Sequence, residues 1–374
     1  MSQILSIIRN SVGEVAEADL NTPIEDLGID SIDFFDLRVA LDNHAGKEIA
    51  DSDWLGFTTF QQILDFYGAG QNGNGQASAG VENSDPNFRQ HKINMPQMAL
   101  TGLSENWLFK EIGDFHWNVL CQGLGTDSSQ IQDEFGNRLY ATFVRIRLIN
   151  STHLRDFKEN ESLSMRTEMS RYGNSMYFSN LKVQGDENKS IDAQLMTTFS
   201  YRNKENNKSL KKGQPFGVNN TIEALPAMPD FGQQYRLLRK QELKTVELLG
   251  EVFQVTDKEL HQRTYQINPY LDLNGVGLLY FAAYPIINDV CEARYFNEHH
   301  PNLVREHWAN EAYTLARDVY YMSNCNITDD IIYRVHEMEI LPENRVRIQS
   351  TLSRSSDGQT LARMFTIKSL VGRS

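Results

Sequence analysis

The sequence predicts an α+β protein: a small helical unit followed by two similar units that each combine one helix with antiparallel strands. Three observations support this prediction. Helical periodicity dominates the first seventy residues, and a Gly- and Asn-rich segment follows them. From Met95 onward, a helical pattern is twice followed by a run of strand-like segments. At 374 residues the chain is long enough for two or three domains.

The first unit, residues 1–70, is predicted to be a four-helix domain. Apolar residues recur at helical spacing from Ile4 to Val15 and from Ile32 to Leu41. A further helix is indicated by "FTTFQQILDFYG", with Thr58 or Thr59 as its cap. The unit holds thirteen Asp and Glu against three Lys and Arg, a net charge of −10 out of −13 for the whole chain. This balance argues against nucleic-acid binding and favours docking onto basic protein surfaces.

Residues 71–93 are predicted to be a flexible linker because they are rich in Gly, Asn, Ser and Ala. A first α+β unit is expected over 94–215 and a second over 216–374, with a polar connection at 203–213. Their helices are expected at 105–120 and 273–287. The predicted strands are 138–149, 161–172, 175–185 and 190–202, and then 314–327, 330–341, 345–354 and 359–371.

The two α+β units resemble an internal repeat. The interval from Gly102 to Asp186 is 84 positions and that from Gly275 to Gly358 is 83, each running from a helix to the turn between the last two strands. A helix followed by an antiparallel meander, occurring twice, fits two hot-dog units, in each of which a sheet wraps one helix. The pattern alone leaves open a single-sheet α+β domain of another topology.

Several function classes lack their sequence signatures. No dinucleotide fingerprint, P-loop, GxSxG elbow or HExxH motif occurs, so no nucleotide redox cofactor is expected. The longest apolar run, near Pro285, is too short for a membrane span. Unpaired cysteines and the absence of a charged-then-apolar leader lead us to expect a cytoplasmic protein. No metal is expected, because the spacing of three clustered histidines suits no common metal motif: His299, His300 and His307.

Ser31 has two interpretations. As a helix N-cap, its hydroxyl would accept a hydrogen bond from a backbone N–H in the first turn. However, "LGIDSI", residues 27–32, is similar to the attachment motif Leu-Gly-x-Asp-Ser-Leu of the acyl carrier protein family, with Ile32 in place of the usual Leu. This resemblance covers residues 1–70 and implies 4′-phosphopantetheine on Ser31, added by a phosphopantetheinyl transferase. The free backbone N–H groups at a helix start favour the phosphate of that group. Ser31 can therefore both cap the helix and carry the phosphopantetheine.

Two further motifs lie in the α+β region: "MPQMALTGLSENWLFKEIGDFHW" and "LDLNGVGLLYFAAYP". The second is similar to a hot-dog thioesterase pattern, with Asn274 at the catalytic Asp position and then Gly277, Tyr280, Phe281 and Tyr284. Together with "GNRLYATF", they resemble the bifunctional acyltransferase/decarboxylase family of polyketide pathways, typified by the leinamycin-pathway enzyme. The resemblance covers about residues 94–374.

That resemblance implies a double hot-dog fold and a definite reaction. The family takes methylmalonyl from coenzyme A, decarboxylates it, and delivers propionyl to a carrier-protein thiol. Its reactive tyrosine matches Tyr140 best. The implied partners are an acyl-CoA substrate and other polyketide synthase enzymes; whether the protein forms a homodimer is left open. The sequence does not decide between malonyl, methylmalonyl and larger donors.

Chemistry assigns roles to the candidate residues, each with a structural alternative. Loss of CO₂ leaves an enolate, which N–H donors around Gly277 can stabilise. Asn274 is expected to position substrate because an amide is no general base; otherwise it is a turn residue. Tyr280 and Tyr284 are expected in the substrate pocket or in the core.

His116 is the last candidate, expected in the pocket or as a cationic residue near a helix C-terminus. Two rival functions remain for the whole protein. One is a hot-dog dehydratase or thioesterase acting on carrier-bound acyl chains. The other is a non-catalytic scaffold that presents such a chain.

Overall fold

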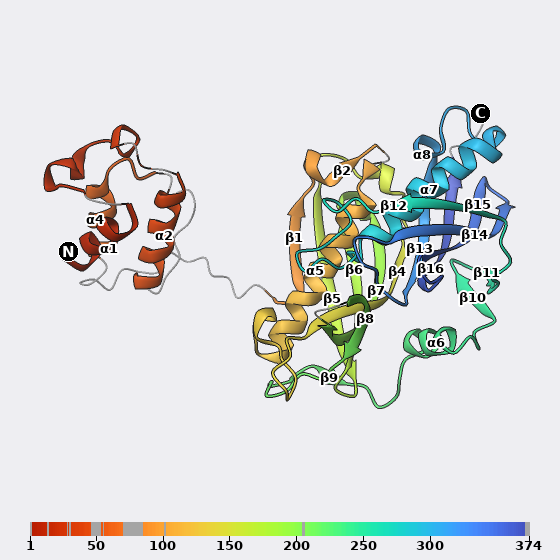
Figure 1. Ribbon diagram of the computed structural model, residues 1–374. Coiled ribbons are helices and arrows are strands. Elements are labelled where there is room, and N and C mark those ends of the chain that lie inside the picture. The colour runs from red at the N-terminus through yellow and green to blue at the C-terminus, as the bar shows by residue number, and fades with distance from the viewer. Residues whose placement is uncertain are drawn as a thin grey trace. The chain divides into compact units, whose positions relative to one another are not determined.

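The computed structural model describes residues 2–12, 15–27, 29, 31–45, 54, 56–69, 85–100, 102–203 and 206–370. The chain divides into two compact units, Met1–Asn83 and Ser84–Ser374, which are drawn in Figure 1. No helix within the described ranges is long and apolar enough to cross a membrane.

The first unit is helical around one small core. Its described elements are α1 (Ser2–Val12), two 3₁₀ turns (Glu17–Asn21 and Ile24–Leu27), α2 (Ser31–Ala45) and α4 (Phe60–Ala69). Residues 46–53 lie outside the described residues, so the expected count of four helices stays a prediction. The predicted cap is confirmed: the Thr59 hydroxyl accepts from the Gln62 backbone N–H at 3.4 Å, and Gln62 Oε1 accepts from the Thr59 N–H at 3.3 Å.

The unit's core combines aliphatic and aromatic side chains. The rings of Phe34 and Trp54 lie 4.7 Å apart, and Tyr67 donates a 2.6 Å hydrogen bond to the buried Asp42 carboxylate. The buried apolar residues of this core are Ile4, Ile8, Val15, Leu37, Leu41, Trp54, Phe60, Ile63, Leu64 and Tyr67. Their spacing follows the helical periodicity of the sequence.

The second unit is built on one large sheet, ordered β1-β5-β6-β7-β4-β13-β16-β15-β14-β12 within the described residues (Figure 1). These neighbours all pair antiparallel. The strands are β1 (Phe88–Lys92), β4 (Tyr140–Ile149), β5 (Ser162–Tyr172), β6 (Met176–Gly185), β7 (Ser190–Asn203), β12 (His261–Gln266), β13 (Ala312–Tyr321), β14 (Asp330–Leu341), β15 (Arg345–Arg354) and β16 (Thr360–Leu370).

The order of one long helix and then four strands occurs twice. Helix α5 (Glu105–Leu124) precedes β4 to β7, and α7 (Ala283–His299) precedes β13 to β16. Residues of both helices and of both strand sets share one hydrophobic core. The two halves of the sheet meet where β4 pairs with β13. The repeat order and the predicted strands therefore agree with the structure, except that the strand expected at 314–327 ends at Tyr321 and 322–327 is irregular.

The opposite face of the sheet carries a shorter helix, α6 (Asp230–Arg239). Side chains alternate between the faces of a strand, and on β13 Val319 and Tyr321 belong to the core with α5 and α7, whereas Tyr320 packs in a cluster with Leu238 of α6. The strands β10 (Thr245–Leu248) and β11 (Glu251–Gln254) add to this cluster.

The seam between the two halves is closed at one end and open at the other. Strands β4 and β13 pair only from Arg145 to Ile149, opposite 316–320. Beyond Ile149 the Asn150 backbone N–H donates to Leu315 O at 2.7 Å, and its side chain donates to Thr314 O at 2.8 Å. In the other direction, Tyr140–Phe143 continues to pair with β7 but not with β13.

Some expected element positions are wrong. The helix expected at 273–287 begins only at Ala283, because 274–282 forms a turn and an irregular entry instead. The connection expected at 203–213 contains β8 (Asn206–Lys212), which pairs with β7. β1 lies inside the range expected to be linker. Further elements were not expected: β2 (Met98–Ala99), β3 (Gly102–Leu103), β9 (Glu223–Ala224), α8 (Trp308–Glu311) and short 3₁₀ turns at 95–97, 128–130, 154–156, 186–188 and 301–303.

Candidate active site

A cavity of about 700 Å³ occupies the open end of the seam. Its walls come from the first five residues of β4, from the segment that follows β13, from β7 and β8, from α5 and α6, and from the irregular entry to α7. The cavity is lined both by Phe143, which belongs to the core with α5 and α7, and by Val144, which packs with residues of α6. It therefore reaches both faces of the sheet through the gap between β4 and β13.

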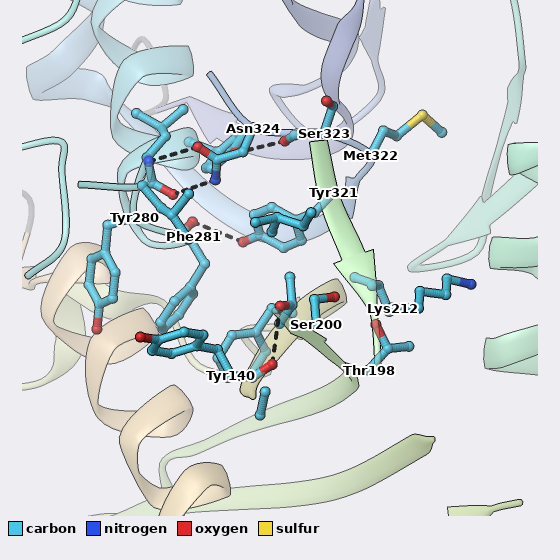
Figure 2. Close-up of a pocket in the computed structure, with 18 of the residues that line it drawn as sticks. Tyr140, Thr198, Ser200, Lys212, Tyr280, Phe281, Tyr321, Met322, Ser323 and Asn324 are labelled. Carbon is cyan, nitrogen blue, oxygen red and sulfur yellow. Dashed lines mark hydrogen bonds between the residues drawn. The ribbon is translucent and has the colours of Figure 1, made fainter. Parts of the chain in front are cut away.

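The two ends of this cavity differ in chemistry. One end, against α5 and α7, is aromatic; the other, against α6 and β8, is basic. Figure 2 shows Tyr280 and Phe281 on the side opposite to Met322 and Lys212, with Tyr321 between them. The aromatic end comprises Trp117, Phe143, Tyr280, Phe281 and Tyr284, and the basic end comprises Lys208, Lys212, Arg236, Arg239 and Lys240.

Tyr140, the predicted catalytic tyrosine, lines the cavity. It is the first residue of β4, is half-buried, and pairs across the ladder with Ser200 of β7. Within the described part of the chain its hydroxyl has no hydrogen-bond partner, while the Arg138 guanidinium lies 5.0 Å from its ring centroid. Thr142 and Thr198, the next cross-strand pair on that face, also line the cavity. Tyr140 thus presents a free donor beside other hydroxyls.

Asn274 also lines the cavity, and its side chain closes a turn. Its Oδ1 accepts from the backbone N–H groups of Val276 (3.1 Å) and Leu278 (3.0 Å). Because Oδ1 must face these donors, the Nδ2 amino group points the other way. The structure records no partner for this amino group among the described residues. The Asn274 oxygen therefore has the expected role in a turn, and the Nδ2 amino group remains available as a hydrogen-bond donor.

Gly277 does not line the cavity, and its expected role as an N–H donor is wrong. Its N–H donates to Asn274 O at 2.8 Å, and its carbonyl accepts from Asn207 Nδ2 at 2.7 Å. Its φ of +75° explains the glycine, since other residues rarely adopt this conformation. The start of α7 does not supply such a donor at Ala283 either, because its N–H donates to Tyr280 O at 2.8 Å, and Pro285 in the same turn has no N–H.

Tyr280 and Tyr284 both line the cavity but are held differently. The Tyr284 hydroxyl donates to Ser323 O at 2.9 Å, and burial raises its pKa well above the usual value. Tyr321 donates in the same way to Phe281 O at 3.0 Å, as Figure 2 shows. Burial, and then the nearby Asp114 carboxylate, raise the pKa of Tyr280. These tyrosines are neutral donors; Tyr284 fixes the wall, and Tyr280 remains half-buried at the aromatic end.

His116 lies in the core and not at the cavity, so both expectations for it are wrong. It sits within α5, well before the end of that helix, and is fully buried. Its ring nitrogens lie 2.7 Å from Ser179 Oγ and 2.9 Å from Thr197 Oγ1. Burial lowers its pKa to about 3, so the ring is neutral at pH 7.

Two wall residues were not anticipated from the sequence. The Asn324 side chain binds both backbone groups of Leu279. Its Oδ1 accepts from the Leu279 N–H at 2.9 Å, and its Nδ2 donates to the Leu279 carbonyl at 3.1 Å. Arg354, buried at the end of β15, donates to the carbonyls of Asn324 and Lys208 and to Ser323 Oγ. Both clamp segments far apart in the chain, and no local pattern marks such a role.

Few acidic residues line the cavity. The only carboxylate among the described lining residues is Asp114, which accepts from Arg89 Nη1 at 2.8 Å and from Asn118 Nδ2 at 3.1 Å. No group of three or more His, Cys, Asp or Glu that could hold a metal ion occurs in the described ranges.

In the first unit, α2 begins at Ser31, as expected; the Ser31 side chain lies outside the described residues. A serine at a helix start fits a phosphodiester, because the first backbone N–H groups of a helix attract an anion. Residues 2–67 match the family model described as "phosphopantetheine attachment site". The first unit is therefore a carrier domain, and its cofactor is covalently bound 4′-phosphopantetheine.

Solved structures resemble the second unit. A putative oleoyl thioesterase from Lactobacillus plantarum matches with a TM-score of 0.53 at 8% identity, covering 76% of this chain and 95% of that one. An acyl-ACP thioesterase from Bacteroides thetaiotaomicron (11% identity, 75% and 96% coverage) and a 12:0-ACP thioesterase from Umbellularia californica (10%, 76% and 94%) each give a TM-score of 0.49.

At 8% identity, the match to the Lactobacillus plantarum structure shows the fold. The second unit has a hot-dog-like thioesterase fold with a large antiparallel sheet and long helices. The protein thus combines a phosphopantetheine carrier domain with a unit of hot-dog-like thioesterase fold.

Proposed function

We propose that the protein catalyses decarboxylative acyl transfer: it converts methylmalonyl-CoA, or a related malonyl-CoA, to a short acyl thioester on a carrier-protein thiol, that of its own carrier domain. The observation that carries this proposal is the seam cavity, where Tyr140 and Asn274 present donors in a hot-dog-like fold fused to a carrier domain. We further propose that the two helix-and-strand halves are two fused hot-dog units, related by the repeat of the sequence.

Decarboxylation needs stabilisation of negative charge on the thioester oxygen. The bond between the α-carbon and the carboxylate breaks, its electron pair moves toward the thioester carbonyl, and CO₂ leaves; a proton then adds to the α-carbon. In the transfer step the carrier thiol gives up its proton and its sulfur attacks the thioester carbonyl carbon; the bond from that carbon to the CoA sulfur breaks, and CoA leaves as the thiol with the proton. Two described groups can donate to the oxygen: the Tyr140 hydroxyl and the Asn274 Nδ2 group. Removing one such donor typically costs about 10²–10³-fold in rate. Phe143 and Phe281, with ring centroids 4.3 Å apart, supply apolar surface that favours departure of neutral CO₂.

Hydrolysis is the second candidate, since the unit has a thioesterase-like fold. A hydrolase of this type needs a base to activate water. Asn274 stands at the position where the sequence pattern has Asp, and an amide cannot take a proton at neutral pH. Asp114, the only described lining carboxylate, is paired with Arg89. Both observations favour transfer over hydrolysis; Asp114→Asn is the variant that would abolish hydrolysis if this alternative held.

The carrier domain supplies the acceptor. When attached, 4′-phosphopantetheine provides a thiol on a long arm, and we assign its attachment to Ser31, the first residue of α2. The implied partners are the phosphopantetheinyl transferase that adds the group and the polyketide synthase enzymes that take the acyl product.

Intact-mass measurement of the pantetheinylated full chain tests this function. With methylmalonyl-CoA we expect a propionyl increment that requires Ser31, together with release of CO₂. A hydrolase would release free acid and CoA and leave the mass of the pantetheinylated chain unchanged. A mass that stays unchanged without release of acid would indicate a presenting scaffold.

Tyr140→Phe tests the catalytic assignment. It removes only the hydroxyl, so we expect the loading rate to fall by about 10²–10³-fold while pantetheinylation of Ser31 is unaffected. Tyr201→Phe, on β7 and outside the cavity lining, is the matched control and should load at the parent rate. Undiminished loading by Tyr140→Phe would remove Tyr140 from the catalytic residues.

A further inference from the structure

The basic end of the cavity gathers five cationic side chains around one opening. Arg236 and Arg239 lie one turn apart on α6, Lys240 follows that helix, and Lys208 and Lys212 come from β8. All except Lys208 are exposed. Segments separated by some thirty residues of chain thus place like charges together, which is unfavourable unless an anion binds between them.

Few carboxylates neutralise these charges. Lys208 pairs with Asp329 at 3.2 Å, and Arg239 donates to the carbonyl of Met322 at 2.7 Å. In the described part of the chain, Lys212, Arg236 and Lys240 have no ion-pair partner. Three to four positive charges therefore remain available at the opening of a cavity that contains the proposed reactive groups.

The shape of the cavity limits which anionic ligands can occupy it. The Tyr140 hydroxyl and the aromatic end lie within the seam, whereas the cations lie on the α6 face of the sheet. A ligand that spans both ends needs a reactive, uncharged end and an anionic end joined by a slender linker that fits between β4 and the segment after β13. A pantetheine thioester ending in a phosphate has this form.

We propose that Lys212, Arg236 and Lys240 bind the phosphate of a phosphopantetheine arm that threads the seam from the α6 face. Lys208 and Arg239 flank this phosphate site. The identity of the thioester rests on the proposed function, but binding can be measured without turnover. Two sources share this chemistry: free CoA, and the arm of the carrier domain.

Calorimetric titration of the full-length Ser31→Ala protein, which lacks its own arm, tests the site. We expect 4′-phosphopantetheine to bind at least about tenfold more tightly than pantetheine, the typical effect of a charge-assisted hydrogen bond. In Lys212→Gln/Arg236→Gln/Lys240→Gln this ratio should fall below about twofold. The three side chains are exposed and make no ion pair in the described structure, so folding should not change.

The control removes the same charge elsewhere. Lys158→Gln/Lys182→Gln/Lys258→Gln changes three exposed lysines outside the cavity lining and should keep the parent ratio. A phosphate preference that is equal in both triple variants, or absent from the parent, would overturn the proposal.

The source of the phosphate is distinguished by comparing the Ser31→Ala protein with the pantetheinylated wild type. If the arm of the carrier domain uses the site, the wild type binds free phosphopantetheine more weakly. If only free CoA uses the site, the two proteins bind 4′-phosphopantetheine equally tightly, and both still bind it more tightly than pantetheine. If binding depends on the phosphate but no CO₂ is released from methylmalonyl-CoA, the phosphate site is supported and only the proposed reaction is contradicted.

Discussion

Gly113 lies where α5 meets the aromatic end of the cavity. A Cβ built at this position would lie 2.3 Å from Cζ of Phe281, far inside van der Waals contact. Phe281 packs against Phe143 and Tyr280, with ring centroids 4.3 and 4.6 Å away. Gly113 thus sets how deeply the Phe281 ring can withdraw from the cavity.

Gly113→Ala should push Phe281 into the cavity and narrow it. We expect the ratio of loading rates for malonyl-CoA over methylmalonyl-CoA to rise about tenfold, the usual effect of one methyl group in a tight pocket. Initial rates by intact mass measure this ratio. Gly275→Ala is the control, because a Cβ there meets no atom within 4 Å. An unchanged ratio in Gly113→Ala would show that Phe281 does not limit the acyl group.

His116 makes stability depend on pH. Its pKa of about 3 in the folded protein lies below the usual 6.5 because the ring is buried. The unfolded chain therefore binds the proton more readily, and stability is complete above pH 6.5 and lost as the pH falls toward 3. Between pH 7 and pH 5 this histidine alone should cost about 2 kcal/mol.

Urea unfolding of wild type and His116→Gln at pH 7 and pH 5 measures this effect. The glutamine variant should be less stable at pH 7, since a packed core site is changed, but should lose about 2 kcal/mol less on acidification. Equal losses in the two proteins would mean that the ring is already protonated or accessible to solvent in the folded state.

Among single residues, the sequence identifies those that lie in a recognisable motif but not those whose role depends on a contact between distant segments. Tyr140 and Asn274 were found because a pattern surrounds each of them. Asn324 and Arg354 lie in strand-like segments, and their clamping role exists only after β13 and β15 meet the entry to α7. The sequence misplaces His116 because "HWNVL" suggests a helix end, whereas apolar residues continue the buried face to Leu124.

At the scale of elements, β13 is tied to both long helices through the fully buried Arg317. Its Nε donates to Glu105 of α5 at 2.6 Å and its Nη2 to Asp289 of α7 at 2.8 Å. Lys368 of β16 reaches the same Asp289 and the buried Glu292 at 3.1 and 2.7 Å. Burial raises the pKa of Asp289, but Arg317 and Lys368 lower it more, so the carboxylate stays charged.

Arg317→Met should destabilise the second unit by about 3–5 kcal/mol, because it removes a fully buried guanidinium and leaves the largely covered Glu105 and Asp289 carboxylates, 13% and 29% exposed, short of positive charge. The midpoint of urea unfolding measures the loss. Arg334→Met is the matched control: its pair with Glu259 is partly exposed, and removing it should cost less than about 1 kcal/mol. Similar losses in both variants would show that the buried network adds nothing beyond a surface pair.

Regular strands were predictable and irregular segments were not. β15 was expected at 345–354 and lies there, since alternating apolar residues and turn residues define it locally. The start of α7 was expected too early, because Leu278, Leu279 and Phe281 suggest a helix while the Asn274 turn holds their backbone elsewhere. α6 gains its partners from distant strands, such as Tyr320 of β13, whereas β8 pairs with the adjacent β7 but has the polar sequence "NNKSLKK" without alternating apolar residues.

For the whole molecule, the separation into a carrier domain and a hot-dog-like unit has a kinetic consequence for the proposed reaction. The two compact units are Met1–Asn83 and Ser84–Ser374. The composition of 71–84, which precedes the described residues that lead into β1, predicts a chain with a root-mean-square span of about 20 Å. A tether of this kind presents its cargo at an effective concentration in the millimolar range. Loading of Ser31 on the same chain should therefore outpace loading on another molecule at any ordinary protein concentration.

Two variants separate the two routes. Ser31→Ala keeps the hot-dog-like unit but has no acceptor, and Tyr140→Phe keeps the acceptor but has lost the proposed donor. We expect wild-type self-loading to be first order and unchanged from about 1 to 100 µM protein, because the acceptor is tethered. Loading of Tyr140→Phe by Ser31→Ala should be at least about tenfold slower at 1 µM and rise in proportion to concentration. If the mixture at 1 µM loads as fast as the wild type, the tether gives no advantage and the carrier domain serves other molecules.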